Sequence, residues 1–501
     1  MSFRIKAAAG ARSLSLSAAA SVIIGFAQTI VLSRLLQPRD FGLSAMIWAV
    51  LGFAGFLADM GVSNAIVYRQ DTSSDALSSL YWVNIAAGFV VAVAVLLSGP
   101  LLVGFYREPI LKQLVPWVAL SFLITASGQQ FSKLAQRDLH FNRIATSDVV
   151  FASVGFLVSG AYAYLGYGVF SLVYAAVAAP FARSVFLMQR SWSEWRPRLH
   201  FARRDLKGFL RFGFLQMGER GANYWWSNID YVIVGRYLGS SSLGIYRLAY
   251  ETVVRPLGIV NPIMNTVAFP IFAKKQNDDE GLRRGFLEVM RLLGTMVWPI
   301  LAGLAVVAPY AVPVIFGPKW VPAIPIIQIL CILGILRAMA NPAGNILLAK
   351  GKVESSFRWN VYQAIMSTLV FWLVVRRGIV ALSWSAVAVM AASILLSWNS
   401  YYRQTINLSP VSYLKNLVKP ITFSTLMMPG VYGVLRVVQR SGLHNNYLLL
   451  TLGVGAGVLI YFALILGLDG EYARSVLRLF TLRTAKSFPE RRDTGFRLVG
   501  E

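Results

Sequence analysis

Charged side chains occur inside long apolar stretches of this sequence, where each needs a chemical reason to be present. In the stretch 242–272, Arg247, Glu251 and Arg255 follow one another at i+4 steps, which places them along one side of a helix. A charged side chain at the centre of a bilayer costs about 2.5–3.5 kcal/mol on insertion scales. Arg247 and Glu251 can offset that cost as a structural ion pair, although Arg247 is also a candidate ligand-binding residue. Arg255 has no partner at the next step along. Because guanidinium groups bind phosphate oxygens in a planar, bidentate way, Arg255 is predicted to bind an anion.

The preceding apolar stretch, 209–235, carries a second group of polar residues. Glu219, Asn223 and Asp230 stand at i, i+4 and i+11, which is one face of a helix, and Arg220 lies beside them. In a membrane such a face must point into the helix bundle or into a wet cavity. Arg220 and Asn223 are therefore predicted to bind a ligand. The two acids are candidates to bind a proton or a cation.

Two further candidates have structural alternatives. Arg337, Asn341 and Asn345 form an i, i+4, i+8 stripe, which is predicted either to line a cavity or to make polar contacts between helices. Asp59 lies near the end of an apolar stretch and could instead cap a helix or pair locally. We predict Arg337 as a ligand-binding residue and Asp59 as a gating residue.

The composition indicates that the helices carrying these residues lie in a membrane. The 501-residue chain is 56% hydrophobic with a mean hydropathy of +0.59, against about 45–50% apolar residues in soluble proteins. Its apolar runs have the length of about 20 residues that crosses roughly 30 Å of hydrocarbon as a helix. Alternating ten-residue segments typical of outer-membrane barrels are absent. The expected spans are 14–36, 41–61, 79–103, 114–131, 147–165, 168–188, 209–235, 242–272, 286–309, 322–348, 357–375, 379–401, 417–437 and 446–468.

The net charge of +25 has a topological explanation and does not indicate nucleic acid. Most basic residues fall at the N-terminus, in loops after even-numbered spans and in the C-terminal tail, with the richest segment at 189–211. The positive-inside rule then predicts a multi-pass protein of the cell inner membrane with both termini in the cytoplasm. The single cysteine, Cys331, allows neither an intramolecular disulfide nor a thiolate metal cluster, and no metal or cofactor is expected.

An internal repeat organises the spans. Arg34 and Gly42 recur, with the same spacing between them, as Arg236 and Gly244, an offset of 202 residues. Because six spans separate the two copies, they have the same orientation in the membrane. The repeat is therefore parallel, with spans 1–6 followed by spans 7–12. The predicted fold is an all-α polytopic membrane protein of about 14 transmembrane helices, with two six-helix repeats around a central cavity and two C-terminal helices. The expected divisions are 1–190 as the N-terminal lobe, 191–208 as a basic cytoplasmic linker, 209–403 as the C-terminal lobe, 404–470 as two additional helices and 471–501 as a basic cytoplasmic tail.

Four short segments, in this order, resemble polysaccharide-export flippases of the Wzx type: 33–43 (SRLLQPRDFGL), 57–63 (LADMGVS), 134–141 (LAQRDLHF) and 316–320 (FGPKW). The resemblance implies the multidrug, oligosaccharidyl-lipid and polysaccharide exporter fold, working by alternating access. It also implies an undecaprenyl-pyrophosphate-linked oligosaccharide as substrate, moved to the periplasmic leaflet for exopolysaccharide, capsule or O-antigen synthesis. A polymerase and export machinery would be its partners.

In such a carrier, the candidates for coupling or gating are Glu219, Asp230, Glu251 and Asp59. The family follows no single residue signature for its sugar, so no site residue is transferred by motif.

Two other functions remain open from the residues. An ion-coupled exporter of drugs or metabolites would prefer an acidic cavity for cationic substrates, whereas this chain offers intramembrane arginines. A membrane polysaccharide polymerase or ligase would be expected to have a large periplasmic loop, and the longest outward loop, near 309–322, is short. The sequence holds no Walker A motif, zinc-ligand spacing or nucleophile elbow. We therefore expect a monomeric carrier with no catalytic residue, which is not an enzyme.

Overall fold

The computed structural model describes residues 3–55, 66, 72–203, 209–274, 278–349, 353–398 and 402–468, and these contain helices and no strand. Side chains are described for fewer residues, with those of 204–220, 258–277 and 341–357 among the ones left out. The helices are α1 (Phe3–Leu35), α2 (Pro38–Leu51), α5 (Ser74–Tyr106), α6 (Leu111–Arg137), α7 (Phe141–Tyr164), α8 (Val169–Ser191), α9 (Phe209–Lys274), α10 (Asp279–Ile315), the 3-10 helix η2 (Pro318–Ala323), α11 (Ile324–Ala349), α12 (Val353–Val374), the 3-10 helix η3 (Val375–Arg377), α13 (Ile379–Ser397), α14 (Arg403–Ile406), α15 (Pro410–Arg440) and α16 (Asn446–Leu468).

Local sequence explains where several helices begin. Helix α2 starts with Pro38 in its first turn, where the missing N–H is no loss, and the Asp40 carboxylate accepts from the Gln37 backbone N–H at 2.9 Å. Helix α10 starts after Asp278, whose carboxylate accepts from the Gly281 N–H at 2.8 Å. These caps satisfy donors that have no partner within the helix.

Among the described residues, ten helices are long and apolar enough to cross a membrane. This supports a multi-pass membrane protein, although the predicted number of fourteen is not confirmed. The four other expected spans fall on α2, on the two halves of α9 and on α12. Helix α9 has 66 residues, about 99 Å at 1.5 Å per residue, against roughly 30 Å of hydrocarbon. Gly239 interrupts it with φ 82° and ψ 175°, a left-handed φ that suits glycine and separates the two halves.

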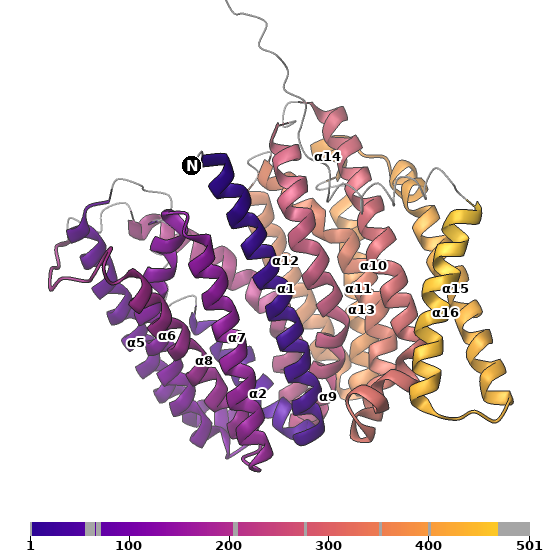
Figure 1. The fold of residues 1–501 in the computed structure, drawn as a ribbon, viewed down its shortest axis with the longest axis horizontal. Coiled ribbons are helices and arrows are strands. Elements are labelled where there is room, and N and C mark those ends of the chain that lie inside the picture. The colour runs from indigo at the N-terminus through magenta and orange to yellow at the C-terminus, as the bar shows by residue number, and fades with distance from the viewer. Residues whose placement is uncertain are drawn as a thin grey trace, which may run out of the picture.

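The helices form two groups that are visible side by side in Figure 1. Helices α1 and α5–α8 pack together, and α9–α13 form the second group. Helix α2 packs chiefly against α9 and so lies at the junction of the groups. Helices α15 and α16 pack against each other and against α10, at the yellow edge of the bundle. We refer to α1–α8 as the N-lobe and to α9–α13 as the C-lobe.

Helices α1 and α10 both end on the side of the bundle opposite the N-terminus, here called the distal end (Figure 1). A Cβ atom on Gly42 would overlap the carbonyl oxygen of Ser240, and one on Gly244 would overlap the carbonyl oxygen of Pro38. The two glycines, Gly42 and Gly244, are 202 residues apart, and so are their partners, Pro38 and Ser240. This is the offset of the predicted repeat. A pseudo-twofold relation between α1–α2 and α9 would produce this reciprocal contact.

Candidate functional site

A ladder of three charged side chains lies along the second half of α9. Arg247 Nε and Glu251 Oε1 are 2.7 Å apart, and Arg255 Nη2 lies 3.6 Å from Glu251 Oε2. Glu251 therefore pairs with Arg255 as well as with Arg247, so Arg255 has a partner that precedes it. Two guanidinium groups share one carboxylate, which leaves the ladder with a net charge of +1. Each side chain is between 23 and 31% exposed, so the ladder is not sealed off.

Both arginines of the ladder reach across to the N-lobe. Arg247 Nη1 donates to Ser44 Oγ at 3.2 Å on α2. Arg255 donates to the Thr29 hydroxyl on α1, and its guanidinium lies 5.7 Å from the Phe26 ring centroid. The ladder thus lies at the interface of the two lobes, where a change in their relative position would break its contacts.

A second polar group lies inside the C-lobe. Asp230 is 5% exposed and accepts from the Tyr246 hydroxyl at 2.9 Å and from the Tyr231 backbone N–H at 2.9 Å. Arg337, on α11, donates to the Tyr250 hydroxyl and lies 5.6 Å from the Trp226 ring centroid. The ring centroids of Tyr231 and Tyr250 are 5.7 Å apart, so aromatic packing joins the acid and the arginine.

The cavity beside this second group is small. It has a volume of about 20 Å³ and is lined by Trp226, Asp230, Arg337 and by Gln363 and Ser367 of α12, among others. A single water needs about 10–15 Å³ by this measure, so one water fits and a pyrophosphate does not. In this conformation Arg337 is therefore a half-buried cation that faces aromatic rings within the C-lobe, and no hydrogen bond or ion pair of the described residues joins it to the ladder.

The structure brings some predicted site residues together and leaves others undescribed. Arg247, Glu251 and Arg255 form one group, and Asp230 and Arg337 form the other. Asn223 is exposed and, seven residues before Asp230, shares its helix face. The side chains of Glu219, Arg220, Asn341 and Asn345, and the whole of Asp59, lie outside the described residues.

A set of contacts at the distal end was not predicted from the sequence. Lys319 Nζ donates to the carbonyl oxygens of Arg34 at 3.0 Å and Leu36 at 2.5 Å, where α1 ends. Trp320 is fully buried, donates from Nε1 to the Ser33 carbonyl at 2.8 Å and packs edge-on against Phe41. We call Lys319 and Trp320 with these partners the distal latch. The Gly317-Pro318 turn before η2 was the available signal, but a turn does not reveal its partner.

Glu108, between α5 and α6, adds a second link at this end. Its carboxylate accepts from Arg39 Nη2 at 2.8 Å and from the Ser240 hydroxyl at 2.6 Å. Ser240 belongs to the C-lobe and Arg39 to α2, so one carboxylate holds segments of both lobes. The inter-lobe hydrogen bonds therefore cluster at the distal end and around the ladder.

An apolar groove of about 510 Å³ runs between Phe53, which follows α2, the first half of α9 and α12. Trp225 lines the groove, while its neighbour Trp226 faces Arg337 on another side of α9. The lining residues are Phe53, Gly221, Ala222, Trp225, Val361, Ala364, Ile365, Thr368 and Leu369. Apolar and charged surfaces are thus separated only by the width of one helix.

Long apolar helices in two lobes define a polytopic membrane protein. The profile of the family described as polysaccharide biosynthesis protein matches residues 31–325, more than half of the chain. The chain belongs to this family, and its resemblance to Wzx-type polysaccharide transporters is confirmed.

Curated relatives agree over most of the chain. It is 32% identical to the teichuronic acid biosynthesis protein TuaB of Bacillus subtilis, covering 94% of this chain and 97% of the relative. It is 35% identical to the lipopolysaccharide biosynthesis protein WzxC of Escherichia coli, covering 73% and 74% of the two chains. The succinoglycan biosynthesis transport protein ExoT of Rhizobium meliloti is 24% identical, with 93% of each chain covered.

Solved structures share the fold. The lipid II flippase MurJ, in an inward closed conformation, superposes with a TM-score of 0.74 at 12% identity, covering 93% of this chain and 99% of that one. An inward-facing multidrug resistance transporter of the MATE family superposes with a TM-score of 0.61 at 13% identity, covering 76% and 94%. At these identities the likeness concerns the fold alone.

Proposed function

We propose that this protein is a flippase that moves undecaprenyl-pyrophosphate-linked oligosaccharide repeat units from the cytoplasmic to the periplasmic leaflet by alternating access. The observation that carries the proposal is the Arg247–Glu251–Arg255 ladder, a partly exposed, net positive group at the interface of two lobes. Pyrophosphate is a compact anion, and guanidinium is the side-chain group that binds its oxygens in a bidentate way. The family and the names of its members support a polysaccharide precursor as the cargo.

The distribution of contacts supports a state open toward the N-terminal end of the bundle. The lobes are joined at the distal end by the latch and Glu108. On the half of α1 nearer the N-terminus, Leu16 and Ile23 are 63% and 69% exposed. If the N-terminal end faces the cytoplasm, as the basic residues predict, this is the state that loads substrate.

In the proposed cycle, Arg255 exchanges its contact with Thr29 for the pyrophosphate, and the lipid tail lies in the apolar groove beside α9. With the cytoplasm negative, expelling the anion is electrically downhill by about 2.3 kcal/mol per charge per 100 mV. Asp230 and Glu219 are proposed to take up a proton or cation that helps the empty carrier to reset. Released repeat units would pass to a polymerase and export machinery, and the carrier would act as a monomer.

The rival transport function is an ion-coupled exporter of drugs or metabolites, and a strain that lacks this chain separates the two. We expect the deletion strain to accumulate lipid-linked repeat units in the cytoplasmic leaflet and to lose the surface polysaccharide, while its resistance to cationic drugs stays unchanged. Leaflet-resolved labelling of the lipid-linked sugars measures the first effect. Polysaccharide made at the normal level by the deletion strain, together with drug sensitivity, would establish the rival function.

A further inference from the structure

The distal end of the bundle has two seams between the lobes, and the 202-residue offset relates them. At the first seam Arg34, near the end of α1, donates to the carbonyl oxygens of Val314 and Ile315, at the end of α10. At the second seam Arg236, 202 residues after Arg34, lies with its guanidinium carbon 5.5 Å from the ring centroid of Phe105, near the end of α5. In the predicted repeat, α5 and α10 are the third spans of their halves. We call the two contacts the α1–α10 seam and the α5–α9 seam.

Each seam holds one buried aromatic side chain. Trp320 follows α10 and donates from Nε1 to the Ser33 carbonyl oxygen at 2.8 Å. Tyr106, at the end of α5, lies against Gly235, the residue that the offset matches with Ser33, since a Cβ atom on Gly235 would be 2.9 Å from Tyr106 Cε1. The Tyr106 hydroxyl is buried and has no hydrogen-bond partner among the described residues. The polar atom of the aromatic side chain is therefore paired at the α1–α10 seam and unpaired at the α5–α9 seam.

The charged groups of the two seams differ in what they lose when the lobes separate. Lys319 donates to two carbonyl groups at the end of α1, in the opposite lobe, so opening the α1–α10 seam would remove both acceptors. Glu108 accepts from the Ser240 hydroxyl across the α5–α9 seam at 2.6 Å, and also from Arg39 of its own lobe at 2.8 Å. The Glu108 carboxylate therefore keeps a charged partner when the α5–α9 seam opens.

These contacts make the α5–α9 seam the weaker of the two. Charge-assisted hydrogen bonds, such as those of Arg34 and Lys319, are stronger than a cation–π contact at an exposed ring such as Phe105, which is 42% exposed. A buried hydroxyl without a partner destabilises the closed state, and water can pair with it once the seam opens. Both differences favour opening at the α5–α9 seam.

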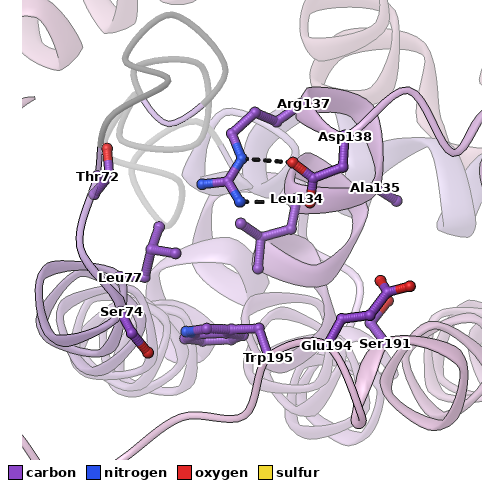
Figure 2. Close-up of a pocket in the computed structure, with 10 residues that line it drawn as sticks. All are labelled: Thr72, Ser74, Leu77, Leu134, Ala135, Arg137, Asp138, Ser191, Glu194 and Trp195. Atoms are coloured by element: carbon purple, nitrogen blue, oxygen red, sulfur yellow. Dashed lines mark hydrogen bonds and ion pairs between the residues drawn. The ribbon is translucent and has the colours of Figure 1, made fainter.

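Ion pairs at the opposite end of the N-lobe join residues of that lobe to one another. Figure 2 shows this region, where the turn after α8 lies beside the end of α6 and the start of α5. Arg137 Nε donates to Asp138 Oδ1 at 2.8 Å, and the Glu194 carboxylate accepts from both terminal nitrogens of Arg143. These residues all come from N-lobe helices and the turns that follow them. Their ion pairs can stay intact while the lobes move, unlike the contacts across the two distal seams.

We infer that the distal end opens at the α5–α9 seam while the α1–α10 seam stays closed as a hinge, and that the lipid-linked cargo leaves the space between the lobes through the opened seam. A twofold relation about the crossing of Gly42 and Gly244 puts the two seams on opposite sides of it, so one can act as the hinge for the other. The exit route rests on the proposed function, because a cargo whose lipid tail stays in the hydrocarbon must pass sideways between the lobes to enter the periplasmic leaflet.

Pairs of spin labels across each seam test which one opens. In a Cys331→Ala background, labels at Pro109 and Ser241 span the α5–α9 seam, and labels at Leu35 and Pro318 span the α1–α10 seam. Each position is exposed and adjoins a residue that bonds across its seam. Dipolar EPR of the full-length protein in nanodiscs should give a short and a long distance for the first pair and only a short distance for the second. Long distances for both pairs, for the second pair alone or for neither pair would overturn the inference.

Tyr106→Phe removes the unpaired hydroxyl and keeps the ring, so it should stabilise the closed α5–α9 seam. The ratio of long to short distances for its label pair should fall by about fivefold or more, while the α1–α10 pair stays unchanged. Tyr164→Phe, on a tyrosine that is 81% exposed at the end of α7, is the matched control and should change neither pair. An equal or higher ratio in Tyr106→Phe would mean that the hydroxyl does not oppose closure, and the α5–α9 seam would lose its assignment as the weaker one.

Cross-linking the same two cysteine pairs with a short bismaleimide connects the inference to transport. In liposomes, a cross-link across the α5–α9 seam should abolish translocation of lipid-linked oligosaccharide, while one across the α1–α10 seam should leave the rate close to that of the protein without cross-links. Translocation that survives the first cross-link, or that the second abolishes, would overturn the exit route. Absence of translocation by the protein without cross-links would instead reject the flippase, and the EPR distances would still decide which seam opens.

Discussion

Glu251 sets the charge balance of the ladder because it lies between two guanidinium groups. It is 2.7 Å from Arg247 and 3.6 Å from Arg255, so its bond to Arg247 is the shorter one. Two unit charges 4 Å apart attract by about 1 kcal/mol in water and about 4 kcal/mol at an effective dielectric constant of 20. A pyrophosphate, with more charge than one carboxylate, can therefore compete for Arg255 while Glu251 stays with Arg247.

Arg255→Ala should reduce polysaccharide export by about tenfold or more, because charge-assisted hydrogen bonds contribute about 1.5–3 kcal/mol. Arg255→Lys should restore only part of the rate, since it keeps the charge and loses the planar fork. Export is measured in strains with matched amounts of protein in the membrane. Arg198→Ala is the control, because this arginine is 66% exposed and such an ion pair contributes little. Normal export by Arg255→Ala would remove this residue from the substrate site.

The sequence predicted local pairs of the site better than distant ones. The i+4 spacing predicted the Arg247–Glu251 pair, and the structure has it. The contact of Arg255 with Thr29 joins residues 226 positions apart, which no local periodicity encodes. Arg337 is predicted as a ligand-binding residue, but helix spacing alone gives a face and not the neighbour it meets, and Arg337 lies among aromatic rings inside the C-lobe.

At the scale of elements, the distal latch is an interaction between the end of α1 and the turn that leads into η2. The last carbonyl groups of a helix lack partners within it and carry a partial negative charge, so the Lys319 ammonium is stabilised there. Hydrophobic patterns predicted most helices to within several residues. They placed a loop between 235 and 242, whereas α9 is helical up to and beyond the single break at Gly239. Patterns give no information on which helix end meets which turn.

Lys319→Met should shift the protein toward a state with separated distal ends, because both carbonyl groups at the end of α1 lose their charged donor. Spin labels on exposed Tyr164 and Val380, at the distal ends of α7 and α13, report the separation of the lobes by pulsed EPR. We expect a larger share of long distances in the variant. Lys112→Met removes the same charge from an exposed site at this end and should leave the distribution as in the wild type. Equal distributions in all three proteins would mean that the latch does not hold the lobes.

At the scale of the whole molecule, the reciprocal contact between the two lobes indicates how they can move relative to each other. The exchange in which Gly42 meets Ser240 and Gly244 meets Pro38 forms a close backbone crossing at the distal end. Lobes joined there can rock about the crossing, and the ladder lies between the two ends. The sequence offset of 202 residues matched these two segments as copies of a repeat, but it did not predict that they touch.

The orientation of this arrangement in the membrane decides whether the open end loads or releases cargo. Arg198 follows α8 at the N-terminal end of the bundle, whereas Gly442, between α15 and α16, lies at the distal end. Because basic residues concentrate on the side of Arg198, the positive-inside rule predicts a cytoplasmic location for it, for Gly495 in the C-terminal tail and for the N-terminus. Alkaline phosphatase fused after Gly442 should be active, and fused after Arg198 or Gly495 inactive, while green fluorescent protein should give the opposite pattern. Phosphatase activity at Arg198 and Gly495 would place the open end in the periplasm, and the structure would then represent the state that releases the lipid-linked oligosaccharide.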